Sequence, residues 1–169
     1  MLPRIQTILY ATGLGPGAPY VFRYALALAR QHDAKIIAVS GLEPLSSFGQ
    51  SLVEQYISHE QSEKIHQEAR HSVKARLQER IQRLCDMEGN NGPDQLCRVS
   101  EIRIRDGHPA QVVLEAARET GADLIVMGSH RHTVLGDALL GSTTHQVLHS
   151  ATIPVMVVRI PEGFREAGF

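Results

Sequence analysis

The chain has 169 residues, of which 43% are hydrophobic, and its 17 basic and 18 acidic residues give a formal net charge of −1. This length suits one domain with a buried core, so we expect residues 1–169 to form a single domain. The balanced charge gives no electrostatic reason to expect nucleic acid or a membrane surface as a partner, and we find neither a signal peptide nor an apolar run near the ~20 residues of a membrane span.

The first half of the chain predicts two strands separated by a helix, followed by a long helix. β-branched and apolar runs predict strands over residues 5–12 and 34–42. Apolar residues at helical spacing predict a helix over residues 18–33. Residues 51–87 are polar and charged but carry an apolar stripe at steps of three and four, which predicts one long amphipathic helix; the stripe is formed by Val73, Leu77, Ile81 and Leu84.

The second half alternates strands and helices in the same way. Residues 97–107 alternate apolar and charged side chains, which indicates a strand near a sheet edge. Pro109 in the first turn and Gly121 at the stop delimit a helix over residues 108–121. A wholly apolar strand over residues 122–128, a helix over residues 138–151 and a last strand over residues 153–160 complete the chain.

This alternation predicts an α/β fold, in which helices cover both faces of a doubly wound parallel sheet. Crossovers between the strands must then be right-handed. Ligands of such sheets bind beyond the carboxyl ends of the strands. Three loops are therefore candidates for a binding site, namely residues 13–18, 41–47 and 128–139.

The first candidate loop, GLGPGA (residues 13–18), fits the dinucleotide fingerprint G-x-G-x-x-G/A. Glu43 ends the next strand, where a carboxylate would bind a ribose. An NAD-binding oxidoreductase is therefore one alternative. Pro16 and Pro19 lack amide donors that a phosphate would use, so we favour a simple tight turn here.

The second candidate loop begins where Gly128 and Ser129 follow a buried strand, and it ends where Gly141 and Ser142 open a helix. A phosphate placed there would receive backbone N–H groups, two hydroxyls and the field of the helix terminus. The alternative to a binding site is that these glycines are structural: Gly128 ends the strand, and Gly141 allows the helix to pack closely.

Most of the chain resembles the universal stress protein family. The resemblance runs through ILYAT, YALALARQHDAKIIAVSGLEP and RIRDGHPAQVVLEAARETGADLIVMGSH to LLGSTTHQVLHSATIPVMVVR. It implies a five-stranded parallel sheet with strand order 3-2-1-4-5, a cytoplasmic stress-response protein and, as is usual in the family, a homodimer. Some members of the family bind ATP.

The resemblance also implies a set of binding residues. Nucleotide-binding members carry G-x2-G-x9-G-[S/T]; here Gly128, Gly141 and Ser142 match, whereas Arg131 replaces the second glycine. The family's nucleoside-binding aspartate after the first strand is replaced by Gly13, and its adenine-contacting backbone falls at Gly41. The candidate nucleotide- or anion-binding residues are therefore Thr12, Gly13, Gly41, Gly128, Ser129, Arg131, Gly141 and Ser142.

The two replacements favour weakened ATP binding over tight binding. A missing carboxylate removes a charged hydrogen bond that contributes about 1–3 kcal/mol, and Arg131 either blocks the phosphates or binds them through its guanidinium group. The favoured interpretation is thus a non-enzymatic stress protein that binds a small anionic ligand or a partner at the loop of residues 128–142. The alternative is a universal stress protein that binds ATP or AMP with slow or no hydrolysis.

Neither a catalytic centre nor a metal site is predicted. The chain has no G-x-S-x-G nucleophile elbow and no phosphate-binding P-loop. His130 and His132 flank Arg131, and His145 and His149 share one helix face, but no third ligand follows at a fixed spacing.

The two cysteines, Cys85 and Cys97, form neither a CxxC pair nor a metal-ligand pattern with histidine. We therefore expect two reduced, separate thiols, as is usual in a cytoplasmic protein.

The last strand predicts a homodimer. With strand order 3-2-1-4-5 it lies at a sheet edge, and its apolar residues include Ile153, Val155 and Val157. Such an edge exposes free N–H and C=O groups with little charge to prevent pairing. Antiparallel pairing with a two-fold related copy covers it most simply.

Overall fold

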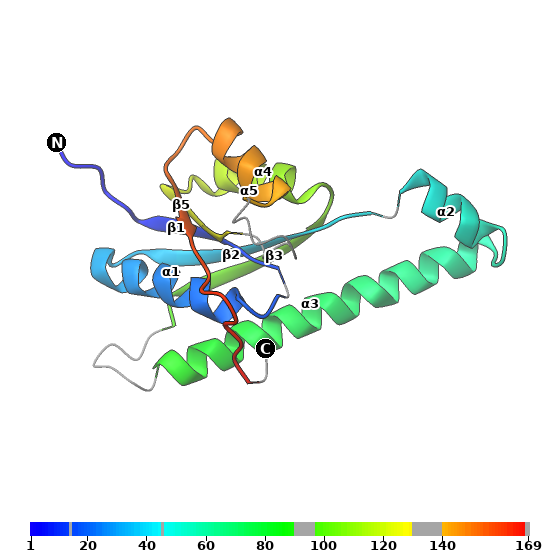
Figure 1. The fold of residues 1–169 in the computed structure, drawn as a ribbon, viewed down its shortest axis with the longest axis horizontal. Coiled ribbons are helices and arrows are strands. Elements are labelled where there is room, and N and C mark those ends of the chain that lie inside the picture. The colour runs from blue at the N-terminus through cyan, green and yellow to red at the C-terminus, as the bar shows by residue number, and fades with distance from the viewer. Residues whose placement is uncertain (14, 45, 90–96, 130–139, 168–169) are drawn as a thin grey trace.

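A computed structural model describes residues 1–13, 15–44, 46–89, 97–129 and 140–167. Within this part of the chain the strands form one parallel sheet with the order β3-β2-β1-β4-β5 (Figure 1). The predicted α/β fold and strand order are confirmed. The strands are β1 (Thr7–Ala11), β2 (Lys35–Leu42), β3 (Val99–Asp106), β4 (Leu124–Gly128) and β5 (Val155–Val158).

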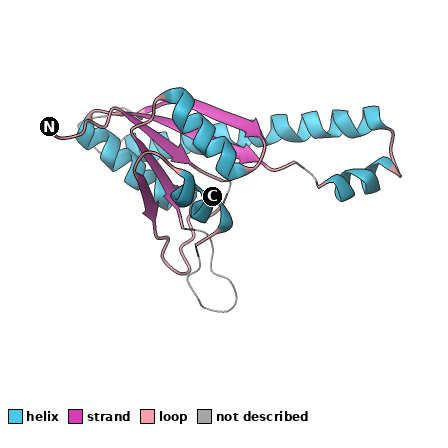
Figure 2. Ribbon diagram, turned by 90° about the horizontal axis from the view of Figure 1, so that it is seen from above, coloured by secondary structure: helices cyan, strands magenta, loops and turns pink. Residues whose placement is uncertain are grey.

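Helices cover both faces of this sheet (Figures 1 and 2). Side chains alternate along a strand, so Ile8 and Tyr10 of β1 pack toward one apolar cluster and Leu9 toward the other. The first cluster contains residues of α1 (Ala18–His32) and α3 (His59–Gly89), and the second contains residues of α4 (Pro109–Thr120) and α5 (Ser142–Ser150).

Burial explains why the strands differ in sequence pattern. The middle strands β1 and β4 are covered on both faces, and residues such as Ile8, Leu9, Ile125 and Val126 have no exposed surface. β3 lies at an edge and is partly exposed, as predicted, but its burial does not alternate: the consecutive residues Ser100 and Glu101 are both exposed. Its pairing with β2 shifts register between Ile36 and Ile37.

The predicted long helix over residues 51–87 is instead two helices, α2 (Ser47–Glu54) and α3. The break has a local cause, because Ser58 and Gln61 form a capping box at the start of α3. The Ser58 N–H donates to Gln61 Oε1 at 3.2 Å, and the Gln61 N–H donates to Ser58 Oγ at 3.3 Å. These two hydrogen bonds pair N–H groups at the start of α3 that have no carbonyl partner within that helix. A separate helix can therefore begin here.

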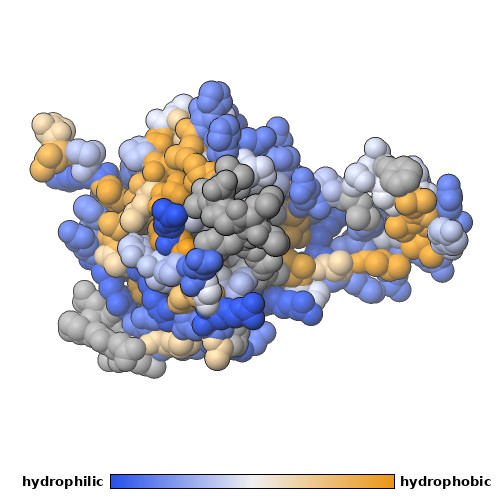
Figure 3. Space-filling view, viewed as in Figure 1, coloured by the Kyte–Doolittle hydropathy of each residue, from blue (hydrophilic) through white to orange (hydrophobic). Residues whose placement is uncertain are grey.

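α2 and the first part of α3 extend away from the sheet as an arm (Figures 1 and 2). The predicted apolar stripe is confirmed where α3 meets the core, since Leu77, Ile81 and Leu84 are buried. Figure 3 shows apolar surface along the arm. Its exposed large hydrophobic side chains include Leu52, Tyr56 and Ile65.

The expectation of two separate thiols is wrong, because Cys85 and Cys97 are joined in a disulfide. The end of α3 packs beside the start of β3 and brings the two Cα atoms to 5.1 Å, a distance that suits a disulfide. Residue spacing could not reveal this contact, because it depends on how helix and strand pack. No helix in the described ranges is long and apolar enough to cross a membrane.

Candidate functional site

A pocket of about 630 Å³ lies at the carboxyl ends of β1, β2 and β4. This is the edge at which open parallel sheets bind their ligands. Five residues predicted from the sequence line it, namely Thr12, Gly13, Gly41, Gly128 and Ser129.

The other predicted residues lie elsewhere or cannot be placed. Gly141 is the N-cap of α5 and Ser142 is its first residue; neither is among the described lining residues, although their neighbours Leu140 and Thr143 are. Arg131 lies outside the described residues, as do His130 and His132.

Packing requires glycine at position 41 and leaves little room for a side chain at position 128. A Cβ at Gly41 would lie 2.7 Å from Pro109 Cα, a backbone atom at the start of α4. A Cβ at Gly128 would lie 3.0 Å from Val21 Cγ2. Gly13 is different, because among the described residues a Cβ there would meet nothing within 4 Å. The structural interpretation of Gly128 therefore agrees with its crowded position, the close packing expected at Gly141 stays a prediction, and packing also accounts for Gly41, which the sequence did not indicate.

The GLGPGA loop forms both a turn and a wall of the pocket. The Ala18 N–H donates to the Gly15 carbonyl at 3.1 Å, which closes the turn before α1. Gly17 is the N-cap of α1. Glu43, the carboxylate that the dinucleotide interpretation requires, is exposed and is not among the described lining residues. The loop therefore lacks the ribose-binding partner of the NAD hypothesis.

Hydroxyl groups fix the walls of the pocket. The Tyr10 hydroxyl donates to the Ala18 carbonyl at 2.9 Å, and burial raises the pKa of this phenol above its usual range. Thr12 Oγ1 donates to the Gly13 carbonyl at 2.9 Å, and Thr144 Oγ1 donates to the Gly128 carbonyl at 3.1 Å. These bonds hold the strand-end loops in place without using an ionised group.

The electrostatic character of the pocket is positive. Arg159, which follows β5, is the charged side chain among the described lining residues. The first turns of α1 and α5 border the pocket and contain no acidic residue. Helix N-termini carry partial positive charge and free N–H groups. The pocket therefore suits a ligand with an apolar part and an anionic part.

Sequence reasoning missed the residues that follow the last strand. Arg159, Ile160, Pro161, Gly163 and Phe164 all line the pocket. The signal was available, since the carboxyl-end rule applies to β5 as it does to the other strands. Thr143 and Thr144, next to the predicted Ser142, were missed as well.

The described lining residues include neither a carboxylate nor a histidine. His145 and His149 of α5 are exposed. In the part of the chain that the structure describes, no group of three or more histidine, cysteine or carboxylate side chains could hold a metal ion. Among these residues there is thus no general acid or base placed for hydrolysis of a bound phosphate ester.

The family model described as the universal stress protein family matches residues 4–159. The chain is 32% identical over 161 residues to universal stress protein A homolog 2 of Coxiella burnetii, covering 92% of this chain and 95% of that protein. It is 29% identical over 157 residues to a universal stress protein of Thermus aquaticus, covering 91% of this chain and 98% of that protein.

Solved structures agree with this. Universal stress protein UspA from Lactobacillus plantarum superposes with a TM-score of 0.66 at 23% identity, covering 94% of this chain and 100% of that chain. A universal stress protein solved in complex with cAMP superposes with a TM-score of 0.56 at 21% identity, covering 94% of this chain and 100% of that chain. The sequence matches and the shared fold lead to one conclusion: the chain belongs to the universal stress protein family.

Proposed function

We propose that this protein binds a nucleoside phosphate in the pocket and acts in the cytoplasm as a non-enzymatic stress-response protein, with residues 1–169 as one domain. One observation carries the proposal. The pocket of about 630 Å³ joins apolar walls to a positive rim at the carboxyl ends of the central strands. Its size falls within the range of cofactor pockets.

The two halves of a nucleotide match the two kinds of surface. The base belongs beside Gly41, where β2 ends and Pro109 and Val113 supply apolar surface. The phosphates belong near Arg159 and the N-terminus of α5, where Thr143 offers a hydroxyl. Backbone N–H groups and an arginine together are a common means of binding phosphate.

We propose that ATP binds more weakly here than in family members that carry a carboxylate after the first strand. At Gly13 no side chain is available to accept a hydrogen bond from the ribose hydroxyls. Arg131 occupies a motif position that the family fills with glycine, and its effect on the phosphates stays a prediction. AMP, which has fewer phosphates to accommodate than ATP, is the preferred ligand.

Slow or absent hydrolysis is part of the same proposal. Activation of water for attack on phosphorus needs a positioned base or metal ion, and the described lining residues offer only hydroxyls, backbone groups and Arg159. Bound nucleotide would therefore serve as a signal rather than a substrate.

We also propose a homodimer joined through β5. In the described chain β5 pairs only with β4. The Ile125 N–H donates to the Pro154 carbonyl and the Ser129 N–H to the Val158 carbonyl. Backbone groups alternate along a strand, so those of Val155 and Val157 face away from β4. The backbone groups of Pro154, which has no N–H, face β4, so the outer edge of β5 keeps its N–H donors.

A ligand panel tests the binding proposal. AMP, ATP, cAMP, NAD and inorganic phosphate are compared by thermal shift and isothermal titration calorimetry. We expect AMP to raise the melting temperature in proportion to the logarithm of its concentration, because it binds only the folded state. Phosphate alone should have a much smaller effect. Equal shifts for AMP and phosphate, or no shift with any nucleotide, would contradict the proposal. Phosphate release from ATP should not exceed that of the buffer.

A further inference from the structure

The disulfide between Cys85 and Cys97 joins two segments that both hold α1. Cys85 lies near the end of α3 and is 8% exposed, whereas Cys97 precedes β3 by two residues and is partly exposed. Arg98, next to Cys97, donates from Nη1 to Asp33 Oδ1 at 2.5 Å, and Asp33 is the C-cap of α1. The segment before β3 is therefore fixed to the end of α1 by a contact that does not involve the sulfur atoms.

The last turn of α3 depends much more on contacts outside its own helix. It contains Asp86 and Glu88 and no basic residue, and carboxylates are unfavourable at a helix C-terminus, which carries partial negative charge. Two arginines of α1 offset this charge. Arg23 Nε donates to Glu88 Oε1 at 2.6 Å, and Arg30 Nη2 donates to the Glu88 carbonyl at 2.9 Å. The disulfide at Cys85, one turn earlier, supplies the covalent tie.

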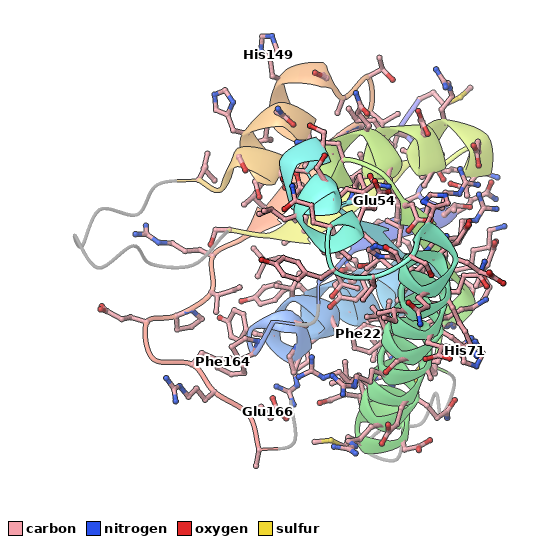
Figure 4. All side chains as sticks on the ribbon, turned by 90° about the vertical axis from the view of Figure 1, so that its right-hand side faces the viewer. Phe22, Glu54, His71, His149, Phe164 and Glu166 are labelled. Carbon is pink, nitrogen blue, oxygen red and sulfur yellow. A yellow bond between two sulfur atoms is a disulfide. The ribbon has the colours of Figure 1, made fainter. Side chains whose placement is uncertain are left out.

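Arg23 also connects the end of α3 to a wall of the pocket. It donates from Nη1 to Glu166 Oε2 at 2.7 Å and from Nη2 to Glu166 Oε1 at 2.5 Å. The side chains of Glu88 and Glu166 are only 23% and 17% exposed. Figure 4 shows Phe164 and Glu166 on the segment that follows β5, beside α1. Phe164 lines the pocket and packs on Tyr20 with the ring centroids 5.1 Å apart, so one arginine holds both α3 and this wall.

We propose that the Cys85–Cys97 disulfide is a reversible redox switch that sets how firmly residues 160–166 are held against the pocket. This rests on the cytoplasmic location proposed above and not on nucleotide binding. Dithiol reductants keep thiols reduced in that compartment, and the disulfides that do form there usually sense the redox state. The switch therefore gives a stress-response protein an input that its fold alone does not provide.

The effect of reduction follows from the contacts of Glu88. Once the disulfide is cut, the last turn of α3 keeps its unfavourable carboxylates without its covalent tie, and this turn opens. Glu88 then leaves Arg23. The Nε contact fixes the plane of the Arg23 guanidinium group, on which the two-pronged contact with Glu166 depends. Residues 160–166 are therefore held less firmly in the reduced protein.

Reduction proceeds by thiol–disulfide exchange with a dithiol. A thiolate of the dithiol attacks the sulfur of Cys97, the more exposed cysteine, which forms a mixed disulfide and expels the Cys85 thiolate. The second thiolate of the dithiol attacks the mixed disulfide and expels the Cys97 thiolate. The dithiol leaves as a disulfide after giving two electrons, and its two protons end on the two cysteines. A disulfide oxidant reverses both steps.

A tryptophan reporter tests the switch without any ligand. The chain contains no tryptophan, so Phe164→Trp places a single one beside Tyr20. Dithiothreitol should move its emission to longer wavelength, because the loosened ring becomes hydrated, while the far-ultraviolet circular dichroism stays native. Oxidised glutathione should restore the emission. With Cys85→Ser and Cys97→Ser added, the emission should equal that of the reduced protein and ignore dithiothreitol. Unchanged emission on reduction, or a shift accompanied by loss of the circular dichroism, would overturn the switch.

Glu88→Gln tests the connection through Arg23. In the oxidised reporter protein this variant should shift the emission as reduction does, and subsequent reduction should add little. Glu79→Gln is the matched control, since Glu79 is an exposed glutamate of α3 that pairs with Arg83 on the same helix. It should leave the emission unchanged. A reporter that shifts on reduction but not with Glu88→Gln would overturn the connection through Arg23.

Trypsin cleavage after Arg165 tests the same change in a chain that keeps Phe164. Arg165 is exposed on the segment that Glu166 holds. The Cys85→Ser, Cys97→Ser variant should be cut there about tenfold faster than the oxidised wild type, the factor expected for one lost hydrogen bond to a charged group. Equal rates would overturn the switch. No nucleotide is added in any of these experiments, so failure of the binding proposal would leave their outcome unaffected.

Discussion

At Gly13 the family resemblance implies an aspartate, and the described structure leaves room for that side chain. A Cβ there meets no atom of the described residues within 4 Å. We predict that Gly13→Asp binds ATP about tenfold more tightly, because the carboxylate accepts hydrogen bonds from the ribose. Calorimetric titration measures the effect.

The control for this variant lies in the same loop. Gly15 also lines the pocket, and a Cβ there also meets no described atom within 4 Å. Gly15→Asp therefore adds the same charge away from the end of β1 and should give no gain. If both variants gain equally, the ribose contact is not the cause.

Arg159 supplies the positive charge of the described pocket wall. We predict that Arg159→Gln weakens AMP binding by roughly tenfold and flattens its dependence on salt, because one charge-assisted phosphate contact is lost. Titrations at low and high salt measure both effects. Arg118 is the control, because it lies in the last turn of α4, whose first residue, Pro109, lines the pocket. Arg118→Gln removes an equal charge and should change neither the affinity for AMP nor its dependence on salt. A loss of affinity similar to that of Arg159→Gln would show that net charge alone matters.

At the scale of elements, the approach of β2 to α4 depends on Gly41. A methyl group there would lie 2.7 Å from Pro109 Cα, so strand and helix must move apart. We predict that Gly41→Ala lowers the free energy of unfolding by about 1–3 kcal/mol, measured by urea denaturation. Gly13→Ala, which adds the same methyl group in open space, should stay within about 0.5 kcal/mol of wild type. If Gly41→Ala were as stable as wild type, α4 would have to move away from β2 without loss of stability, and the prediction would be wrong.

The disulfide ties another pair of elements, α3 and the start of β3. The two cysteines are 12 residues apart in sequence, and closing a loop of that size contributes about 3 kcal/mol. We predict that dithiothreitol lowers the stability of wild type by about this amount, measured by urea denaturation. A Cys85→Ser, Cys97→Ser double variant should be insensitive to the reductant. Alkylation of both thiols in the folded protein after aerobic purification, without reductant, would contradict the disulfide.

For the whole molecule, the predicted consequence of the sheet order is assembly through β5. The N–H of Val157 faces the free edge, so Val157→Pro removes a donor from the proposed dimer ladder but none from the pairing with β4. We predict that this variant is a monomer in sedimentation at tens of micromolar protein. Wild type should be a dimer at the same concentration.

Val157 also packs against the apolar cluster under α4, so a control must keep its shape. Val157→Thr retains both the amide donor and the branched side chain and should remain dimeric. A monomeric wild type, or a Val157→Pro chain that stays dimeric and folded, would place the interface elsewhere.

Much of the fold was determined by the sequence itself, because burying one or both faces of a helix or strand imposes a repeating pattern of apolar residues. Strands covered on both faces must be apolar throughout, and the runs around Ile8 and Ile125 are. β3 is partly exposed at a sheet edge as predicted, and Gly121 ends α4 at φ +60° as its position predicts. Five pocket residues followed from the carboxyl-end rule together with the family motif.

Contacts between distant segments were decided only by the tertiary structure. Arg23 meets Glu88 across 65 residues and Glu166 across 143, and no local pattern marks such partners. Cys85 and Cys97 looked unpaired until α3 was packed beside β3. The glycines at positions 17 and 128 read as features of loops, yet both face the Ile160 side chain. A repeating pattern of apolar residues predicts that a side chain is buried. Which residue it contacts depends on how segments distant in sequence pack together in the folded protein.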